Sequence, residues 1–121
     1  MSAFGDIGSQ QALRIWDGIV VRTVEGVGAT LAVVELDPNG HATTHSHVNE
    51  QLGVVIEGSV RFTVGDETRE LGRGASWSIP AHTPHEAVAG PDGAVLVEVF
   101  APGRSDWAGL ERLDREPRWP R

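Results

Sequence analysis

Short apolar runs, most of them rich in β-branched residues, alternate with turn-forming residues between positions 13 and 100. Runs of this length, bounded by Gly, Pro, Asn and Asp, are typical of the strands of a β-sandwich or barrel. About eight strands are predicted, at residues 13–16, 19–24, 29–36, 51–56, 60–64, 75–79, 86–89 and 94–100. The pattern therefore predicts an all-β fold.

The run at 60–64 shows the periodicity most clearly. Val60, Phe62 and Val64 alternate with Arg61 and Thr63. A period of two places one set of side chains in the core and the other in water.

The pattern changes after residue 102. Asp106 is a suitable N-cap for a short helix that would carry Trp107, Leu110 and Leu113 on one stripe. We expect this helix and the tail after it to pack against the outside of a barrel.

The length of 121 residues fits one domain, and no repeat or linker divides the sequence. We expect a single domain over residues 1–121, with a barrel core at about 13–102 and the helix and tail at 103–121.

Composition removes several classes of function. The chain has no cysteine, lysine or tyrosine, so thiolate zinc sites, Schiff-base lysines and phenolate catalysis are excluded. Its ten basic residues are scattered arginines and its net charge is -7, which argues against a nucleic-acid partner. Residues 1–11 show no leader pattern and no run is long enough to span a bilayer, so we expect a cytoplasmic protein without a membrane partner.

All five histidines lie in two short segments, 41–47 and 82–85. In extended backbone His45 and His47 would point to the same face and could share one ion. If the strand stays regular, Asn49 and Gln51 follow on that face and Glu50 points away, whereas a bulge would reverse this order. The amide oxygen of Gln51 is therefore the expected third ligand, with Glu50 as the second choice.

These residues resemble the two sequence motifs of the cupin family. The first motif is matched by His45-x-His47-x3-Gln51-x6-Gly58, and the second by Gly74-x5-Pro80-x-His82-x2-His85. The resemblance implies a jelly-roll barrel of six to eight strands, with a metal in its mouth held by His45, His47, Gln51 and His85.

The sequence departs from the cupin pattern at several positions. Gln51 stands where glutamate is usual, His82 where glycine is usual and Ala89 where asparagine is frequent, and four residues rather than five separate Gly40 from His45. We expect His41 and His82 to lie outside the metal shell.

Three imidazoles and one amide would form a neutral shell around a single divalent ion. The full charge of the ion would then act on a substrate oxygen, and an octahedral ion would keep two open positions. Nickel, iron, manganese, zinc and cobalt all suit such ligands, and the sequence does not choose among them.

The last predicted strand carries a second set of candidate groups. If Val95, Val97 and Val99 pack outward, Glu98 points into the barrel, where a carboxylate could move protons. A solvated glutamate at the strand edge is an equally good interpretation. Arg104 could hold an anionic substrate, although a free arginine at the rim is the commoner case.

Glu98-x-Phe100-x3-Arg104 resembles the acid-x-Phe-x3-Arg run of KdgF-like cupins of pectin degradation, which linearise 4,5-unsaturated monouronates. The family's acid is typically aspartate. The resemblance implies tautomerisation and ring opening of an unsaturated uronate or a similar small anionic substrate, with Phe100 as an apolar wall. It also implies a homodimer paired through strands near the N-terminus.

Two other functions stay open at this point. Similar metal shells occur in cupin dioxygenases and polyketide cyclases, and cupin domains also serve as non-catalytic modules that bind small molecules. Small cupins that act as sulfoniopropionate lyases are disfavoured, because the resemblance there implies a tyrosine base.

Overall fold

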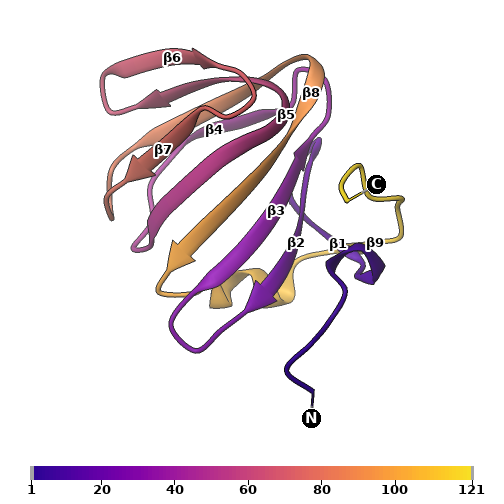
Figure 1. Ribbon diagram of the computed structural model, residues 1–121. Helices are drawn as coiled ribbons and strands as arrows, with labels where there is room; N and C mark the ends of the chain where they lie inside the picture. The colour runs from indigo at the N-terminus through magenta and orange to yellow at the C-terminus, as the bar shows by residue number, and fades with distance from the viewer. Residues whose placement is uncertain (1, 121) are drawn as a thin grey trace.

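The computed structural model describes residues 2–120, which form one antiparallel sheet that curls into a barrel (Figure 1). The strands are β1 (Ala12–Trp16), β2 (Ile19–Glu25), β3 (Thr30–Leu36), β4 (His41–His45), β5 (Glu50–Val64), β6 (Glu67–Leu71), β7 (Ser76–Ile79), β8 (His85–Ala101) and β9 (Arg112–Leu113). Their order is β6-β5-β8-β3-β2-β1-β9, with β4 on β8 and β7 on β5. The predicted all-β jelly-roll class is confirmed.

Two long strands, β5 and β8, connect the layers of the barrel. They pair along nearly their whole length, from Glu50↔Ala101 to Val64↔His85. The first part of β5 also pairs with β7, while the second part of β8 pairs with β3. Each long strand therefore belongs to both faces of the barrel, which brings the start of β8 close to the end of β4.

The sequence predicted four short strands where the structure has these two long ones. Residues 51–56 and 60–64 belong to one strand, and so do 86–89 and 94–100. The register shifts around Gly58, whose φ is 77° and where a Cβ atom would collide with the carbonyl oxygen of Gly93. This glycine allows β5 to bend without ending.

Besides the two-residue β9, two strands were not predicted at all. In β6 every residue except Leu71 is exposed, so the strand lacks the apolar alternation that marks a half-buried strand. The other, β4, pairs irregularly with β8, with a register shift between Ala42 and His45.

The prediction for the C-terminal helix was wrong in its extent and its cap. A 3-10 helix, η2 (Ser105–Gly109), follows the barrel, and its N-cap is Arg104 rather than Asp106. Leu110 is the C-cap, and Leu113 belongs to β9, where it pairs with Ala12. Pairing with β1 therefore replaces further helical turns.

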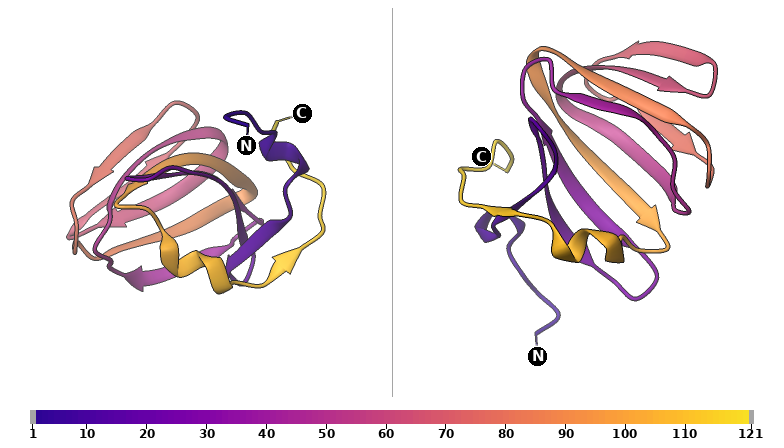
Figure 2. Two further views of the ribbon diagram at one scale, coloured as in Figure 1. Left: turned by 90° about the horizontal axis from the view of Figure 1, so that it is seen from below. Right: turned by 180° about the vertical axis from the view of Figure 1, so that it is seen from behind.

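The position of η2 also differs from the prediction. Seen from below, η2 runs along the rim of the open end of the barrel (Figure 2). Its Trp107 is buried in the main core cluster, on which Leu110 packs. The helix therefore contributes to the interior instead of covering the outside.

The tail after β9 does lie on the outer face of the sheet. There Arg22 and Glu35 form a fully buried ion pair, with Arg22 Nη1 2.9 Å from Glu35 Oε2. Arg22 also donates to the carbonyl oxygens of Gln10 and Arg115, and the Arg118 amide donates to Glu35. This buried pair binds segments from both ends of the chain to β2 and β3.

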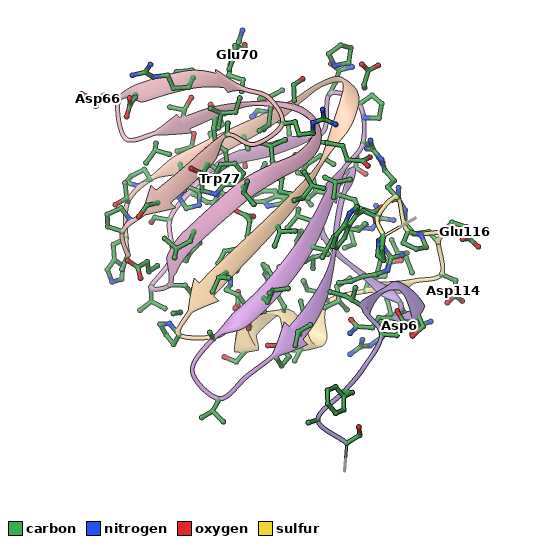
Figure 3. The ribbon with its side chains drawn as sticks, viewed as in Figure 1. Asp6, Asp66, Glu70, Trp77, Asp114 and Glu116 are labelled. Atoms are coloured by element: carbon green, nitrogen blue, oxygen red, sulfur yellow. The ribbon has the colours of Figure 1, made fainter. Side chains whose placement is uncertain are left out.

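Acidic side chains are spread over the outside of the molecule. Figure 3 labels five of them, namely Asp6 near the N-terminus, Asp66 and Glu70 at the turn before β6 and in β6, and Asp114 and Glu116 in the tail after β9. Among residues 2–120, no helix is long and apolar enough to cross a bilayer.

Candidate metal centre

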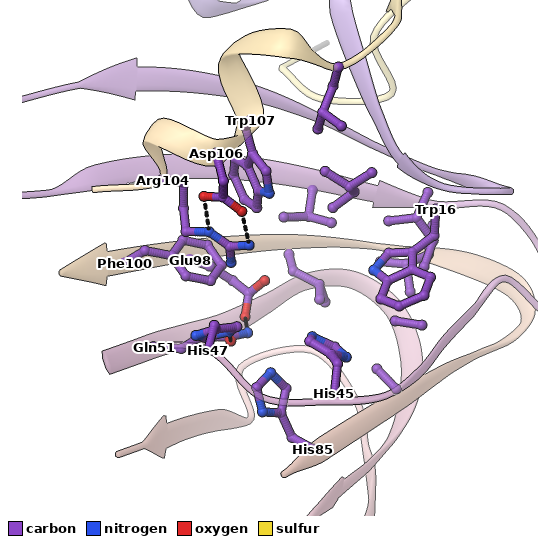
Figure 4. A pocket seen from close by; sticks show the side chains of 18 of the residues that line it. Trp16, His45, His47, Gln51, His85, Glu98, Phe100, Arg104, Asp106 and Trp107 are labelled. Carbon is purple, nitrogen blue, oxygen red and sulfur yellow. Dashed lines mark hydrogen bonds and ion pairs between the residues drawn. The ribbon is translucent and has the colours of Figure 1, made fainter. Parts of the chain in front are cut away.

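Three histidines meet inside the barrel mouth. His45 ends β4 and His85 begins β8, and the two are direct partners across these strands. His47 lies in the loop between β4 and β5. One ring nitrogen from each of the three lies within 4.8 Å of the others, which is the spacing of a shared ion (Figure 4).

Backbone carbonyl groups fix the orientation of all three rings. The Nδ1 atoms of His45, His47 and His85 lie 2.6, 3.0 and 2.8 Å from carbonyl oxygens two residues away in the chain. A carbonyl can only accept, so Nδ1 carries the proton and Nε2 keeps its lone pair. Histidine ligands of metals are commonly oriented in this way.

The Nε2 atom of His85 is the strongest sign that a cation belongs here. It is buried and has no hydrogen-bond partner among the described residues. Burial lowers the pKa of His85 to about 4 and also lowers the pKa of His47, so both rings are neutral at pH 7. Buried polar atoms are nearly always paired, and a divalent ion would supply the missing partner.

Gln51, the second residue of β5, completes the cluster. Its Oε1 lies 3.0 Å from His47 Nε2, while its Nε2 donates to Glu98 Oε2. A neutral His47 cannot donate both to Gln51 and to the Asn49 carbonyl. An ion between His47 Nε2 and Gln51 Oε1 would satisfy both acceptors, so the donor set fits a metal.

Gln51 faces the histidines, as predicted. The predicted cause, one regular strand that continues from His45 to Gln51, was wrong. The chain leaves the strand after His45, and Asn49 turns away to donate to the carbonyl oxygens of Pro102 and Gly103. Glu50 is exposed and points away from the cluster. A new strand starting at Glu50, rather than a continuous one, sets the direction of Gln51.

Glu98 is buried in the cavity beside this cluster, not solvated at a strand edge. Its Oε2 accepts from Gln51 and from Trp77 Nε1, the latter at 2.8 Å. Gly53 makes the second contact possible, because a Cβ there would collide with the Trp77 ring. These donors orient the Gln51 amide, and the other Glu98 oxygen points into the cavity (Figure 4).

Burial raises the pKa of Glu98 to about 7, against the smaller opposing effects of its two hydrogen bonds. A carboxyl group in a cavity with such a perturbed pKa is a frequent feature of active sites.

Arg104 closes the cavity on the side of η2. Its guanidinium carbon lies 4.9 Å from the centre of the Phe100 ring and 4.4 Å from that of Trp107. Nε and Nη2 bind the two oxygens of Asp106 at 3.1 and 3.0 Å. Arg104 is therefore a cation fixed at the cavity wall by Asp106 and two aromatic rings, and not a free arginine at the rim.

The remaining histidines lie outside the cluster. His41 is exposed, with Nε2 2.7 Å from Glu86 Oε2. His82 is also exposed, and its φ of 64° is a left-handed conformation that favours glycine. This backbone angle explains why glycine is usual at this position of the motif.

One cavity of about 250 Å3 is lined by the histidine cluster with Gln51, and by Glu98, Phe100 and Arg104. Sequence reasoning missed three of its lining residues, Trp16, Asp106 and Trp107. Trp16 ends β1 with its ring centroid 5.2 Å from that of His45. No local spacing links these residues to the histidines, so no signal in the sequence could have found them.

Comparison with known proteins agrees with this architecture. A sequence model described as the cupin domain matches residues 32–100, more than half of the chain. The chain belongs to the cupin family. The predicted resemblance to this family is thereby confirmed.

Solved structures of other cupins superpose over most of the chain. An RmlC-like cupin from Shewanella frigidimarina has a TM-score of 0.81 and 24% identity, covering 89% of this chain and 97% of its own. KdgF from Halomonas sp. has a TM-score of 0.79 and 26% identity, covering 88% and 98%. This small cupin therefore resembles KdgF in sequence and in size.

A more distant match is a variant of oxalate decarboxylase from Bacillus subtilis, with a TM-score of 0.73 and 23% identity over 92% of this chain and 33% of that one. At this identity the match shows the shared fold.

Proposed function

We propose that the chain holds one divalent metal ion through the Nε2 atoms of His45, His47 and His85 and the amide oxygen of Gln51. The observation that carries this proposal is the convergence of three oriented Nε2 lone pairs, one of them buried without a partner. The neutral donor set accepts nickel, iron, manganese, zinc or cobalt.

We propose further that this cupin is an enzyme that tautomerises and opens the ring of a 4,5-unsaturated monouronate or a similar small anionic substrate. The Glu98-x-Phe100-x3-Arg104 run and the similarity to KdgF support the proposal. When bound, the ion supplies a Lewis acid that withdraws charge from a substrate oxygen. The reaction is an isomerisation, so no oxidant or reductant is required.

Glu98 would move the proton in this reaction. Ring opening takes a proton from a hydroxyl group as the ring C–O bond breaks, and tautomerisation returns a proton to carbon. The free oxygen of Glu98 points into the cavity, while its other oxygen is held by Gln51 and Trp77. A held carboxylate with one exposed oxygen is suited to both transfers.

Arg104 would bind the substrate carboxylate, and Phe100 would support it. Asp106 uses Nε and Nη2 of Arg104, whereas Nη1 makes no hydrogen bond among the described residues. A guanidinium has a second edge, Nη1 with Nη2, whose N–H groups can donate to another carboxylate. The Phe100 and Trp107 rings keep this edge at the cavity wall.

An iron-dependent oxygenase or a polyketide cyclase is the second candidate. The observation that favours it is the neutral histidine and amide shell, because open positions on such an ion would also serve oxygen or an enolate. Oxygen consumption by the iron-loaded protein would separate an oxygenase from the isomerase, which consumes none.

The decisive experiment measures loss of the unsaturated uronate's ultraviolet absorbance by the metal-loaded protein. We expect Glu98→Gln to abolish turnover with metal content unchanged, since the amide can still accept from Gln51 or Trp77. Arg104→Ala should chiefly raise KM. Glu86→Gln, at a partly exposed glutamate that binds His41 outside the cavity, is the matched control and should leave turnover unchanged. A rate no faster than the spontaneous one would reject ring opening.

We also propose that two copies pair through the outer face of the sheet. Val24, Leu31 and Leu52 are 54%, 38% and 44% exposed, and their register places them in one row across β2, β3, β8 and β5. The row includes β2, near the N-terminus, where the family resemblance places the dimer contact. Sedimentation should show a dimer that Leu31→Glu converts to a monomer; a monomeric wild type would contradict it.

A further inference from the structure

Trp16 presents a hydrogen-bond donor that the proposed function does not use. Its indole lies at the cavity wall with the ring nitrogen on the edge that faces the cavity (Figure 4). Within residues 2–120, this Nε1–H has no hydrogen-bond partner, in contrast to Trp77 Nε1, which donates to Glu98. An indole N–H beside a binding cavity usually has an acceptor when the site is filled.

A second unused donor lies across the cavity. Figure 4 shows Arg104 and Trp16 on opposite sides of the space above the histidines. The Nη1 group of Arg104 is not used by Asp106. The cavity therefore offers one donor at each side, with the metal ligands below and between them.

The wall between these two donors provides almost no hydrogen-bonding groups. It is formed by apolar side chains of β1, β2, β3 and β8, namely Ile15, Ile19, Val34, Leu36 and Leu96. Apart from the histidine Nε2 atoms proposed to bind the ion, the acceptor without a donor within the described cavity is the second oxygen of Glu98. A buried hydroxyl group needs an acceptor for its proton and loses free energy without one.

We infer that Trp16 is a substrate-binding residue, and that the substrate is a small acid with an oxygen acceptor at each end and few hydroxyl groups between. Arg104 takes the carboxylate end, and Trp16 Nε1–H takes the oxygen at the other end. Among sugar acids, this arrangement favours dehydrated, unsaturated members over saturated ones that keep all their hydroxyl groups. The inference rests on the proposed function for the ion and for Arg104.

Three simple acids test this inference without any catalytic turnover. Adipate has a carboxylate at each end and an apolar middle, galactarate has the same carbon chain with a hydroxyl group on each inner carbon, and hexanoate lacks the second carboxylate. Their binding to the zinc-loaded protein is measured by calorimetry. We expect adipate to bind about tenfold more tightly than hexanoate, because one charge-assisted hydrogen bond contributes about 1.4 kcal/mol or more. We expect a similar advantage over galactarate, because the inner hydroxyl groups of galactarate would lose their hydrogen bonds to water against the apolar wall.

The Trp16→Phe variant isolates the N–H group, because phenylalanine keeps an aromatic ring at this position. It should weaken adipate binding about tenfold and leave hexanoate binding unchanged. Trp119→Phe is the matched control, since Trp119 lines a groove on the outer face and should alter neither affinity. Zinc content and the thermal midpoint of each variant verify the fold, and the ranking of the acids on unaltered protein does not depend on any variant.

The outcomes separate this inference from the proposed function. Binding of adipate no tighter than galactarate, or no change on Trp16→Phe, would overturn the inference and leave the metal and anion site intact. No binding of any acid to the zinc-loaded protein would overturn the anion site at Arg104, and the inference with it.

Discussion

The protein contains two buried polar clusters that differ in how completely their members are paired. On the outer face, Arg22 and Glu35 neutralise each other, and all three nitrogen atoms of the Arg22 guanidinium have acceptors. One Glu35 oxygen is left without a partner. Donors and acceptors are otherwise matched, which is what a purely structural cluster requires.

Inside the barrel, the acceptor atoms of one cluster face each other. They are the Nε2 atoms of His45, His47 and His85 and the Oε1 atom of Gln51. The donors of this cluster are all directed outward, to backbone carbonyls or to Glu98. An unbalanced, partly buried cluster, with lone pairs converging on one point, therefore marks a place for a ligand. A balanced buried cluster marks a structural contact.

Removal of two ligands from the unbalanced cluster should change the protein most. The double substitution His47→Ala with His85→Ala removes two of the converging lone pairs. We expect metal content by elemental analysis to fall to background, with affinity reduced by more than about 100-fold. His41→Ala, outside the cluster, is the control. Full metal content in the double variant would show that the site is assigned to the wrong residues.

The balanced cluster should respond in stability and not in metal content. Arg22→Met leaves Glu35 buried without its cation, so we expect a loss of about 3–5 kcal/mol in the free energy of unfolding in urea. Adding Glu35→Leu should recover most of this loss, because an apolar pair of similar volume is tolerated. Metal content per folded chain should stay the same. A stable Arg22→Met single variant would contradict the structural role.

The smallest effect concerns the ligand that departs from the usual motif. Gln51→Leu removes one neutral oxygen donor and keeps the three histidines. We expect metal affinity to fall about 10- to 100-fold, less than in the double histidine variant. Gln11→Leu, at an exposed glutamine, is the control. If Gln51→Leu bound the ion as tightly as the wild type, the ion would have three protein ligands instead of four.

Much of the fold could be predicted from the sequence because strand signals are local. Alternation within 60–64 and glycine-rich connections identified most strands, and motif spacing identified the histidines that meet. The continuity of β5 and β8 could not be predicted, because Gly58 and the segment 90–93 have the composition of turns. The pairing of β5 with β8 on both sides of these residues, between segments distant in sequence, keeps the two strands continuous.

The candidate site was predicted in part for the same reason. His45, His47, Gln51, His85 and Glu98 belong to short motifs or strands whose direction can be inferred. The contacts of Arg104 with Trp107 and Asp106, and the place of Trp16 beside His45, depend on how η2 and β1 meet across the barrel mouth. The catalytic roles, the homodimer and the cytoplasmic location remain predictions.

The buried pair on the outer face also limits how far this protein can be truncated. A fragment with the boundaries of the cupin domain match, residues 32–100, would keep Glu35 and lose Arg22 together with the tail segment that covers the pair. It would also lose Trp16 and Arg104 from the cavity. An expression vector or a domain fusion designed on that match alone would therefore yield a chain without β1 and β2, with Glu35 uncovered on the outer face and with an incomplete pocket.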